Sequence, residues 1–162
     1  MISMKRLALL GLVLVVLLVA GCTSSTESTS GETQTSGQVS GQTKNIMINY
    51  SATTEDAVFS ESGYPSQAES GKVFLVVSMA IKNNGYEKFS TNLFYFSVIA
   101  NNVKYDVDAS TYSIEDGLDS VDVLDGGVLT GKVVFQIPQS ASSGYILSYK
   151  SFETYNIVWS KV

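Results

Sequence analysis

Histidine is absent from the 162 residues, and cysteine occurs once, at position 22. The lack of histidine excludes His-based catalytic triads, His general bases and His-ligated zinc or copper. A single cysteine cannot form an intrachain disulfide. Because most nucleophilic mechanisms need one of these partners, the sequence predicts a protein that is not an enzyme.

Positive charge is scarce and dispersed. The chain has ten Lys and Arg against fifteen Asp and Glu, and the lysines beyond residue 21 stand singly. Removal of residues 1–21 would leave eight basic and fifteen acidic side chains, a net charge of −7. Without clustered Lys and Arg, no nucleic-acid partner and no anionic-lipid face are expected.

No apolar run is long enough for a typical transmembrane helix. The longest, Leu7 to Ala20, follows Lys5 and Arg6 and has fourteen residues. As a helix it would span roughly 21 Å, short of the ~30 Å hydrocarbon core. A positive segment followed by a short apolar one predicts a secretory signal in residues 1–21.

The signal ends in Leu18-Val19-Ala20-Gly21-Cys22. This pentapeptide resembles the lipobox of prokaryotic lipoproteins. The resemblance implies cleavage between Gly21 and Cys22, lipidation of the Cys22 sulfur, and attachment to the extracytoplasmic face of the cell membrane. Lipidation would also remove a reactive thiol. The alternative is an uncleaved signal anchor with an inert Cys22.

Residues 22–43 form the second predicted region, the lipidated cysteine and a linker. Twelve of residues 23–43 are Ser or Thr, and none is aromatic. Such a composition cannot offset the entropy of ordering, so we expect a disordered spacer with a root-mean-square span of roughly 25 Å. O-glycosylation of this linker and an unmodified spacer are both open. Asn49-Tyr50-Ser51, just beyond it, is an N-glycosylation sequon.

Residues 44–162 show strand patterns separated by turns. Val73, Leu75, Val77, Met79 and Ile81 alternate along one face of the strongest predicted strand, Lys72 to Lys82. We expect further strands at 46–50, 93–100, 103–107, 128–137, 145–149 and 155–159, with a two-residue turn at Asn101-Asn102. Residues 51–71 are predicted to be a loop with a short edge strand at 57–59, and residues 109–122 a loop with a helical turn at most. The pattern predicts an all-β, antiparallel sandwich of about seven or eight strands.

Two stretches of this region resemble a known family. Residues 71–85 read G-K-V-F-L-V-V-S-M-A-I-K-N-N-G, and residues 125–138 read D-G-G-V-L-T-G-K-V-V-F-Q-I-P. They are similar to the immunoglobulin-like domains of unknown function found in prokaryotic lipoproteins, which are related to secreted immunogenic β-sandwich antigens. One departure is Asp125, where the family often has proline. The resemblance implies an extracytoplasmic sandwich and brings no catalytic residues.

Acidic residues are the main candidates for a ligand site. Four of them, Asp116, Asp119, Asp122 and Asp125, recur at every third position. Calcium takes six to eight oxygen ligands, so the 106–125 region could hold it, although the EF-hand order is absent. The alternative is a solvated loop that adds solubility. Asp106 and Asp108 would share one strand face, and a hydrolase would need such a pair in a cleft.

Tyrosine is abundant, with nine residues. Most should pack in the sandwich, but those nearest turns, Tyr64, Tyr86 and Tyr112, are expected to be exposed and to form a binding surface. The leading hypothesis is therefore a lipid-anchored interaction module for a protein or cell-envelope partner. The alternative is a lipoprotein that binds calcium or a small ligand through the acidic 106–125 region, in which calcium would be the cofactor.

Overall fold

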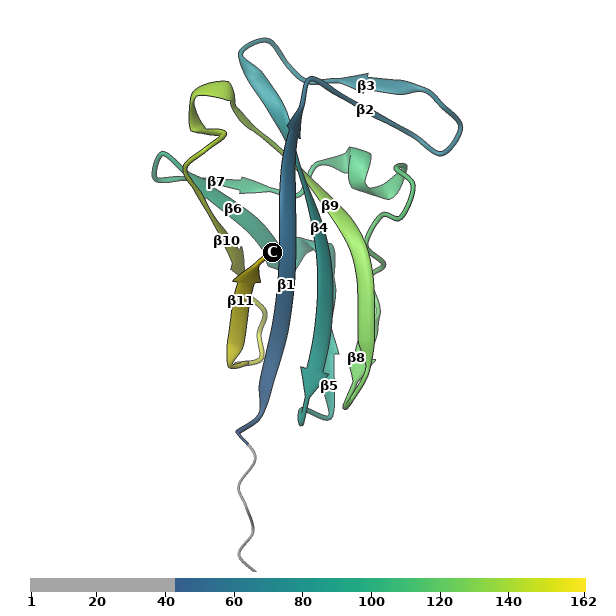
Figure 1. Ribbon diagram of the computed structural model, residues 1–162, viewed down its shortest axis with the longest axis vertical. Coiled ribbons are helices and arrows are strands. Elements are labelled where there is room, and N and C mark those ends of the chain that lie inside the picture. Colours follow the sequence, from purple (N-terminus) through teal and green to yellow (C-terminus); the bar gives the residue numbers. More distant parts are fainter. Residues whose placement is uncertain (1–42) are drawn as a thin grey trace, which may run out of the picture. The chain divides into compact units, whose positions relative to one another are not determined.

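The computed structural model describes residues 43–162, so the predicted signal and nearly all of the predicted linker lie outside the described residues. Within this range the protein consists of β-strands and three short 3-10 helices (Figure 1). No helix in the described range is both long and apolar enough to cross a membrane. The all-β prediction is confirmed.

Two sheets form the sandwich. The first has the order β11-β1-β4-β9, with β1 at Asn45–Glu55, β4 at Lys72–Asn84, β9 at Val128–Pro138 and β11 at Ile157–Lys161. The second has the order β10-β6-β7, with β6 at Phe96–Ala100, β7 at Val103–Asp106 and β10 at Tyr145–Tyr149. The inner faces of the two sheets share one hydrophobic core.

The alternating residues of β4 explain this core. Val77 and Ile81 are fully buried against Phe135 of β9 and Val98 of β6. The predicted inward face of this strand is thereby confirmed. Period-two alternation places every second side chain on the same face, so one apolar stripe is enough to build the core.

The structure has eleven strands, more than the predicted seven or eight, and four of them have only three residues. They form two small sheets, β2 (Ala57–Phe59) with β3 (Pro65–Gln67) and β5 (Lys88–Ser90) with β8 (Asp122–Leu124). β2 is the short edge strand predicted at 57–59, whereas β3, β5 and β8 carry too little alternation to be recognised. The sandwich is also not wholly antiparallel, because β11 pairs with β1 in parallel.

Three local predictions need correction. Residues 51–55 continue β1 instead of starting a loop, because they pair with residues 74–78 of β4. Residues 93–95 form a 3-10 helix, η1, whose Phe94 amide donates to the side chain of Asn92. The predicted loop at 109–122 has its helical turn in a second 3-10 helix, η2, at Ala109–Tyr112, and needs correction only at its end, because β8 starts at Asp122. The Asn101-Asn102 turn is confirmed, with φ values of 51° and 61°.

Candidate functional site

The end of the sandwich reached by β1 is its distal end. Successive strand residues rise about 3.3 Å, so the eleven residues of β1 carry the chain roughly 33 Å from Asn45 to Glu55. The β2–β3 hairpin follows directly and extends beyond the sandwich there, whereas Asn45 lies at the other end (Figure 1). The hairpin is therefore far from the point where the N-terminal segment joins the domain.

The hairpin is hydrogen-bonded to the segment that contains η2, residues 108–118, which we call the η2 segment. Ser60 and Ile114 form an isolated antiparallel bridge, and the Glu61 amide donates to the Ser113 carbonyl at 2.9 Å. Val58 and Ile114 are buried with Phe74 and Val134 in a second, smaller hydrophobic cluster. Phe74 and Val134 belong to the outer face of the first sheet, so hairpin and η2 segment cover that face together.

The η2 segment also closes the free edge of β9. The Asp108 amide donates to the Val134 carbonyl at 2.8 Å, and the Leu118 amide donates to the Lys132 carbonyl at 2.8 Å. Between them, the Thr111 hydroxyl accepts from the Val134 amide at 2.9 Å. An unprotected edge would offer these groups to another strand. The close fit depends on Gly131, because a Cβ there would lie 2.6 Å from the Leu118 Cα.

A groove of about 260 Å³ lies between the hairpin and the η2 segment, over the outer face of the first sheet. Its lining contains four apolar residues (Val58, Phe59, Val76 and Ile114), two residues with hydroxyl groups (Thr53 and Ser78) and three charged residues (Glu55, Glu115 and Lys132). We call it the hairpin groove. Phe59 at its margin is 62% exposed, although its neighbour Val58 is buried. The groove thus combines an apolar floor with carboxylates at its margin.

A second hollow, of about 410 Å³, lies on the other side of η2. Leu93, Phe94, Val107, Ala109 and Tyr112 supply its apolar lining, together with Lys104 and Asp106. Phe94 is 82% exposed and Tyr112 is 66% exposed. Large apolar side chains left in water are characteristic of interaction surfaces.

Two of the three predicted surface tyrosines lie near this end. Tyr64 is 75% exposed and follows the hairpin turn, where its amide donates to the Ser60 hydroxyl. Tyr112 ends η2. The expected exposure of Tyr86 is wrong, because its ring packs edge-to-face on Tyr155 and its hydroxyl accepts from the Asn156 amide. Binding by these tyrosines stays a prediction.

Three of the four regularly spaced aspartates have separate side-chain partners, and Asp119 accepts from the Thr91 hydroxyl only through its backbone carbonyl. Asp116 pairs with Lys132 at 3.4 Å, and Asp122 pairs with Lys88 at 3.5 Å. Among residues 43–162, no three or more acidic side chains converge as a metal ion would require. The geometry therefore does not favour calcium there, and calcium binding stays a prediction.

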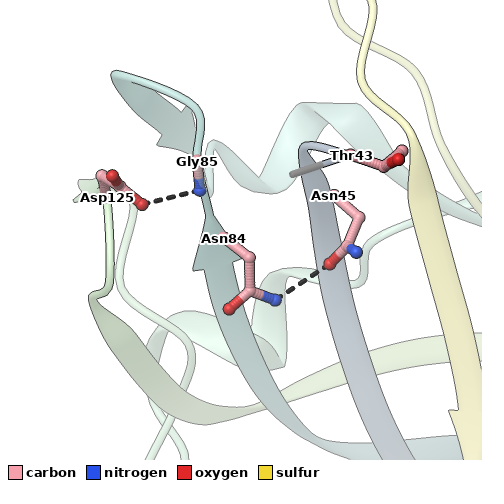
Figure 2. Close-up of a pocket in the computed structure, with 5 residues that line it drawn as sticks. All are labelled: Thr43, Asn45, Asn84, Gly85 and Asp125. Atoms are coloured by element: carbon pink, nitrogen blue, oxygen red, sulfur yellow. Dashed lines mark hydrogen bonds between the residues drawn. The ribbon is translucent and has the colours of Figure 1, made fainter. Parts of the chain in front are cut away.

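Asp125 belongs to a polar pocket at the opposite end of the first sheet (Figure 2). Its carboxylate accepts from the Gly85 amide at 2.6 Å, and Asn84 donates to Asn45 across β4 and β1 at 2.9 Å. Gly85 has a φ of +94°, which favours glycine. Because these polar groups satisfy one another, the pocket holds the turn after β4 together.

The remaining predicted residues are also separated. Asp106 pairs with Lys104 at 2.6 Å, whereas Asp108 accepts from Ser110 and Gln136, so the two carboxylates do not act as a pair. Asn49 lies within β1, paired on both sides, and not in the surface loop typical of a glycosylated asparagine. Gly21 and Cys22 lie outside the described residues.

Sequence reasoning missed Glu55, Phe59 and Glu115 of the hairpin groove. Glu55 and Glu115 are sixty residues apart in the chain, and the contacts between the hairpin and the η2 segment, including the Ser60–Ile114 bridge, bring them together. One local signal was present, since Phe59 ends the short apolar run Ala57-Val58-Phe59 within a mostly polar stretch.

The sequence matches the family described as "Domain of unknown function (DUF4352)" over residues 28–157. Comparison with curated proteins gives no significant match. Two solved structures are similar. One is a candidate lipoprotein, YcdA, of Bacillus subtilis, with 17% identity, a TM-score of 0.46, and coverage of 65% of this chain but 32% of that one. The other is an uncharacterized beta-sandwich protein of Clostridium difficile, with 20% identity, a TM-score of 0.41, and coverage of 70% and 82%.

Proposed function

The chain belongs to the DUF4352 family of domains of unknown function, and from this premise we propose that it is a lipid-anchored interaction module. In this proposal Cys22 holds the protein at the extracytoplasmic face of the cell membrane. The sandwich presents its distal end to a protein or cell-envelope partner. The protein performs no catalysis.

One observation carries the proposal: three exposed aromatic residues lie with the hairpin groove at the end of the domain away from the N-terminal attachment, whereas the exposed Phe152 lies in the loop between β10 and β11. Phe59 and Tyr64 of the hairpin and Tyr112 of η2 are all more than half exposed. A partner that approaches a membrane-anchored domain from outside meets this end first. Aromatic side chains supply much of the binding energy in protein interfaces.

The anchor is supported by the sequence Leu18 to Cys22 and by the Ser/Thr-rich residues that follow. One acyl chain binds a membrane only marginally, whereas two give stable attachment. A lipobox cysteine carrying two or more chains would therefore keep the domain on the membrane.

Photo-crosslinking in intact cells tests where the partner binds. A photoreactive amino acid is placed at Tyr64 or Tyr112, and for comparison at Leu124 or Val128, which are 63% and 62% exposed near the opposite end. We expect a discrete crosslinked product from the tyrosine positions that the comparison positions do not give. Equal products from both ends would contradict the proposal, as would none from the tyrosine positions.

A further inference from the structure

The distal end differs in charge from the rest of the domain. The distal end, with the hairpin and η2, is made up of residues 53–78, 103–117 and 132–145. They contain eight acidic side chains and three lysines. The remaining described residues contain five of each. The domain therefore has a net charge of −5 concentrated at one end, and such a field attracts cations selectively to that end.

All three lysines of the distal end are already paired. Lys72 contacts Glu69 at 2.6 Å, Lys104 contacts Asp106 at 2.6 Å and Lys132 contacts Asp116 at 3.4 Å. The carboxylates of Glu55 and Glu115, which line the hairpin groove, have no lysine nitrogen within 4.0 Å among the described residues, although Lys132 also lines the groove and donates to the Glu115 carbonyl at 3.5 Å. One Glu55 oxygen accepts from the Thr53 hydroxyl at 3.2 Å. The groove thus has two exposed carboxylates whose charge no lysine balances.

The rest of the groove suits the stem of a basic side chain. Val58, Val76 and Ile114 are aliphatic, and Phe59 adds an exposed aromatic ring. Arginine and lysine lay their methylene stems along apolar surface and keep the charged head in water or against an acid. A guanidinium also binds the face of an aromatic ring and hydrogen-bonds to carboxylates.

We propose that the hairpin groove is the binding site for an arginine-bearing segment of a cationic polypeptide. The stem of the arginine lies over Val76 and Ile114, and its head binds Glu55 or Glu115. The acidic field of the distal end steers the segment toward the groove. This inference rests on the proposed function and adds the chemical class of the partner.

Binding of a defined peptide tests this directly. The full mature protein, purified with its lipid in detergent, is titrated against a fluorescent peptide of alternating arginine and serine. A second peptide carries citrulline, the neutral analogue, in place of arginine. We expect binding of the arginine peptide that weakens with salt, and at least tenfold weaker binding of the citrulline peptide.

Two double variants separate the groove from overall charge. Glu55→Gln with Glu115→Gln removes both groove carboxylates. Glu87→Gln with Glu153→Gln makes the same charge change outside the distal end. We expect the first to weaken arginine-peptide binding about tenfold or more and the second less than about threefold, with unchanged melting curves. A third variant, Phe59→Leu, keeps an apolar side chain and should weaken binding by a smaller factor.

Equal weakening by the two double variants would overturn the inference, because binding would then depend on net charge alone. Equal affinity for the arginine and citrulline peptides, or no binding of either, would overturn it as well. The proposed function has a separate outcome. If the glutamine variant at positions 55 and 115 still forms the crosslinked product from Tyr64, the module binds a partner, but not through an arginine in this groove.

Discussion

Replacing Thr111 by valine would test how the η2 segment is held on the sandwich. Thr111 is 1% exposed, and its hydroxyl accepts from the Val134 amide at 2.9 Å. Valine has nearly the same shape but no hydroxyl, so the buried Val134 amide would lose its partner. The Val134 carbonyl would keep the Asp108 amide as its donor, at 2.8 Å. The variant therefore removes the partner of the Val134 amide, together with a longer hydrogen bond of 3.4 Å that the Thr111 hydroxyl donates to the Val134 carbonyl, and leaves the packing in place.

The expected change in the free energy of unfolding follows mainly from the Val134 amide losing its partner. A buried donor left without a partner costs about 1–3 kcal/mol. The methyl group that replaces the hydroxyl returns up to about 0.8 kcal/mol. We expect the free energy of unfolding to fall by about 1–2 kcal/mol. With a urea dependence of about 1–3 kcal/mol per molar, the unfolding midpoint should move down by roughly 0.5–1 M.

Urea unfolding followed by tryptophan fluorescence measures this change, since the chain has one tryptophan, Trp159. Thr130→Val is the matched control, because Thr130 is an exposed residue of β9, the strand that also contains Val134. It should change stability by no more than about 0.5 kcal/mol. Thr111→Ser keeps the hydroxyl, so amide exchange at Val134 should remain slow in that variant and become faster in Thr111→Val. Equal stability of the two valine variants would refute the role assigned to this hydrogen bond.

Three further outcomes are expected. Gly131→Ala places a Cβ 2.6 Å from the Leu118 Cα, and should lower the free energy of unfolding by about 1–3 kcal/mol in urea titrations, whereas Gly144→Ala, with open space around it, should not. Asn83→Leu removes the side-chain partner of the Tyr86 amide and of the Tyr86 and Val123 carbonyls, and should lower the free energy of unfolding by at least about 3 kcal/mol in thermal or urea unfolding. Burial raises the pKa of Tyr149 to about 12, so the unfolded chain loses this proton first, and stability should fall as pH rises from about 10 toward 12, less steeply in Tyr149→Phe.

The strands of the core could be predicted because their pattern is local. From Val73 to Ile81 every second residue of β4 is apolar, which indicates the face toward the core, whereas the burial of Phe74 on the other face depends on the hairpin. The Asn101-Asn102 turn was equally accessible, because asparagine tolerates the left-handed conformation that both residues adopt. The family resemblance pointed to the same sandwich.

The candidate site could not be predicted, because it depends on contacts between distant segments. Ser51 to Glu55 look like a loop, yet they are held as strand by residues 74–78 of β4. The regular spacing of the aspartates suggested a common site, but in the structure Asp116, Asp122 and Asp125 each have a different side-chain partner. Spacing along the chain indicates direction only inside a regular element, and residues 116–121 lie outside any helix or strand. The groove itself exists only because the hairpin and the η2 segment meet.

Mass spectrometry of the protein extracted from membranes tests the central claim most directly. The account predicts that the chain begins at Cys22, with the mass of residues 22–162 increased by that of a lipid. Replacing Cys22 by alanine should abolish this species and release the domain from the membrane fraction or leave it as precursor. An N-terminus at Met1, or an unmodified thiol at Cys22, would contradict a lipid-anchored module.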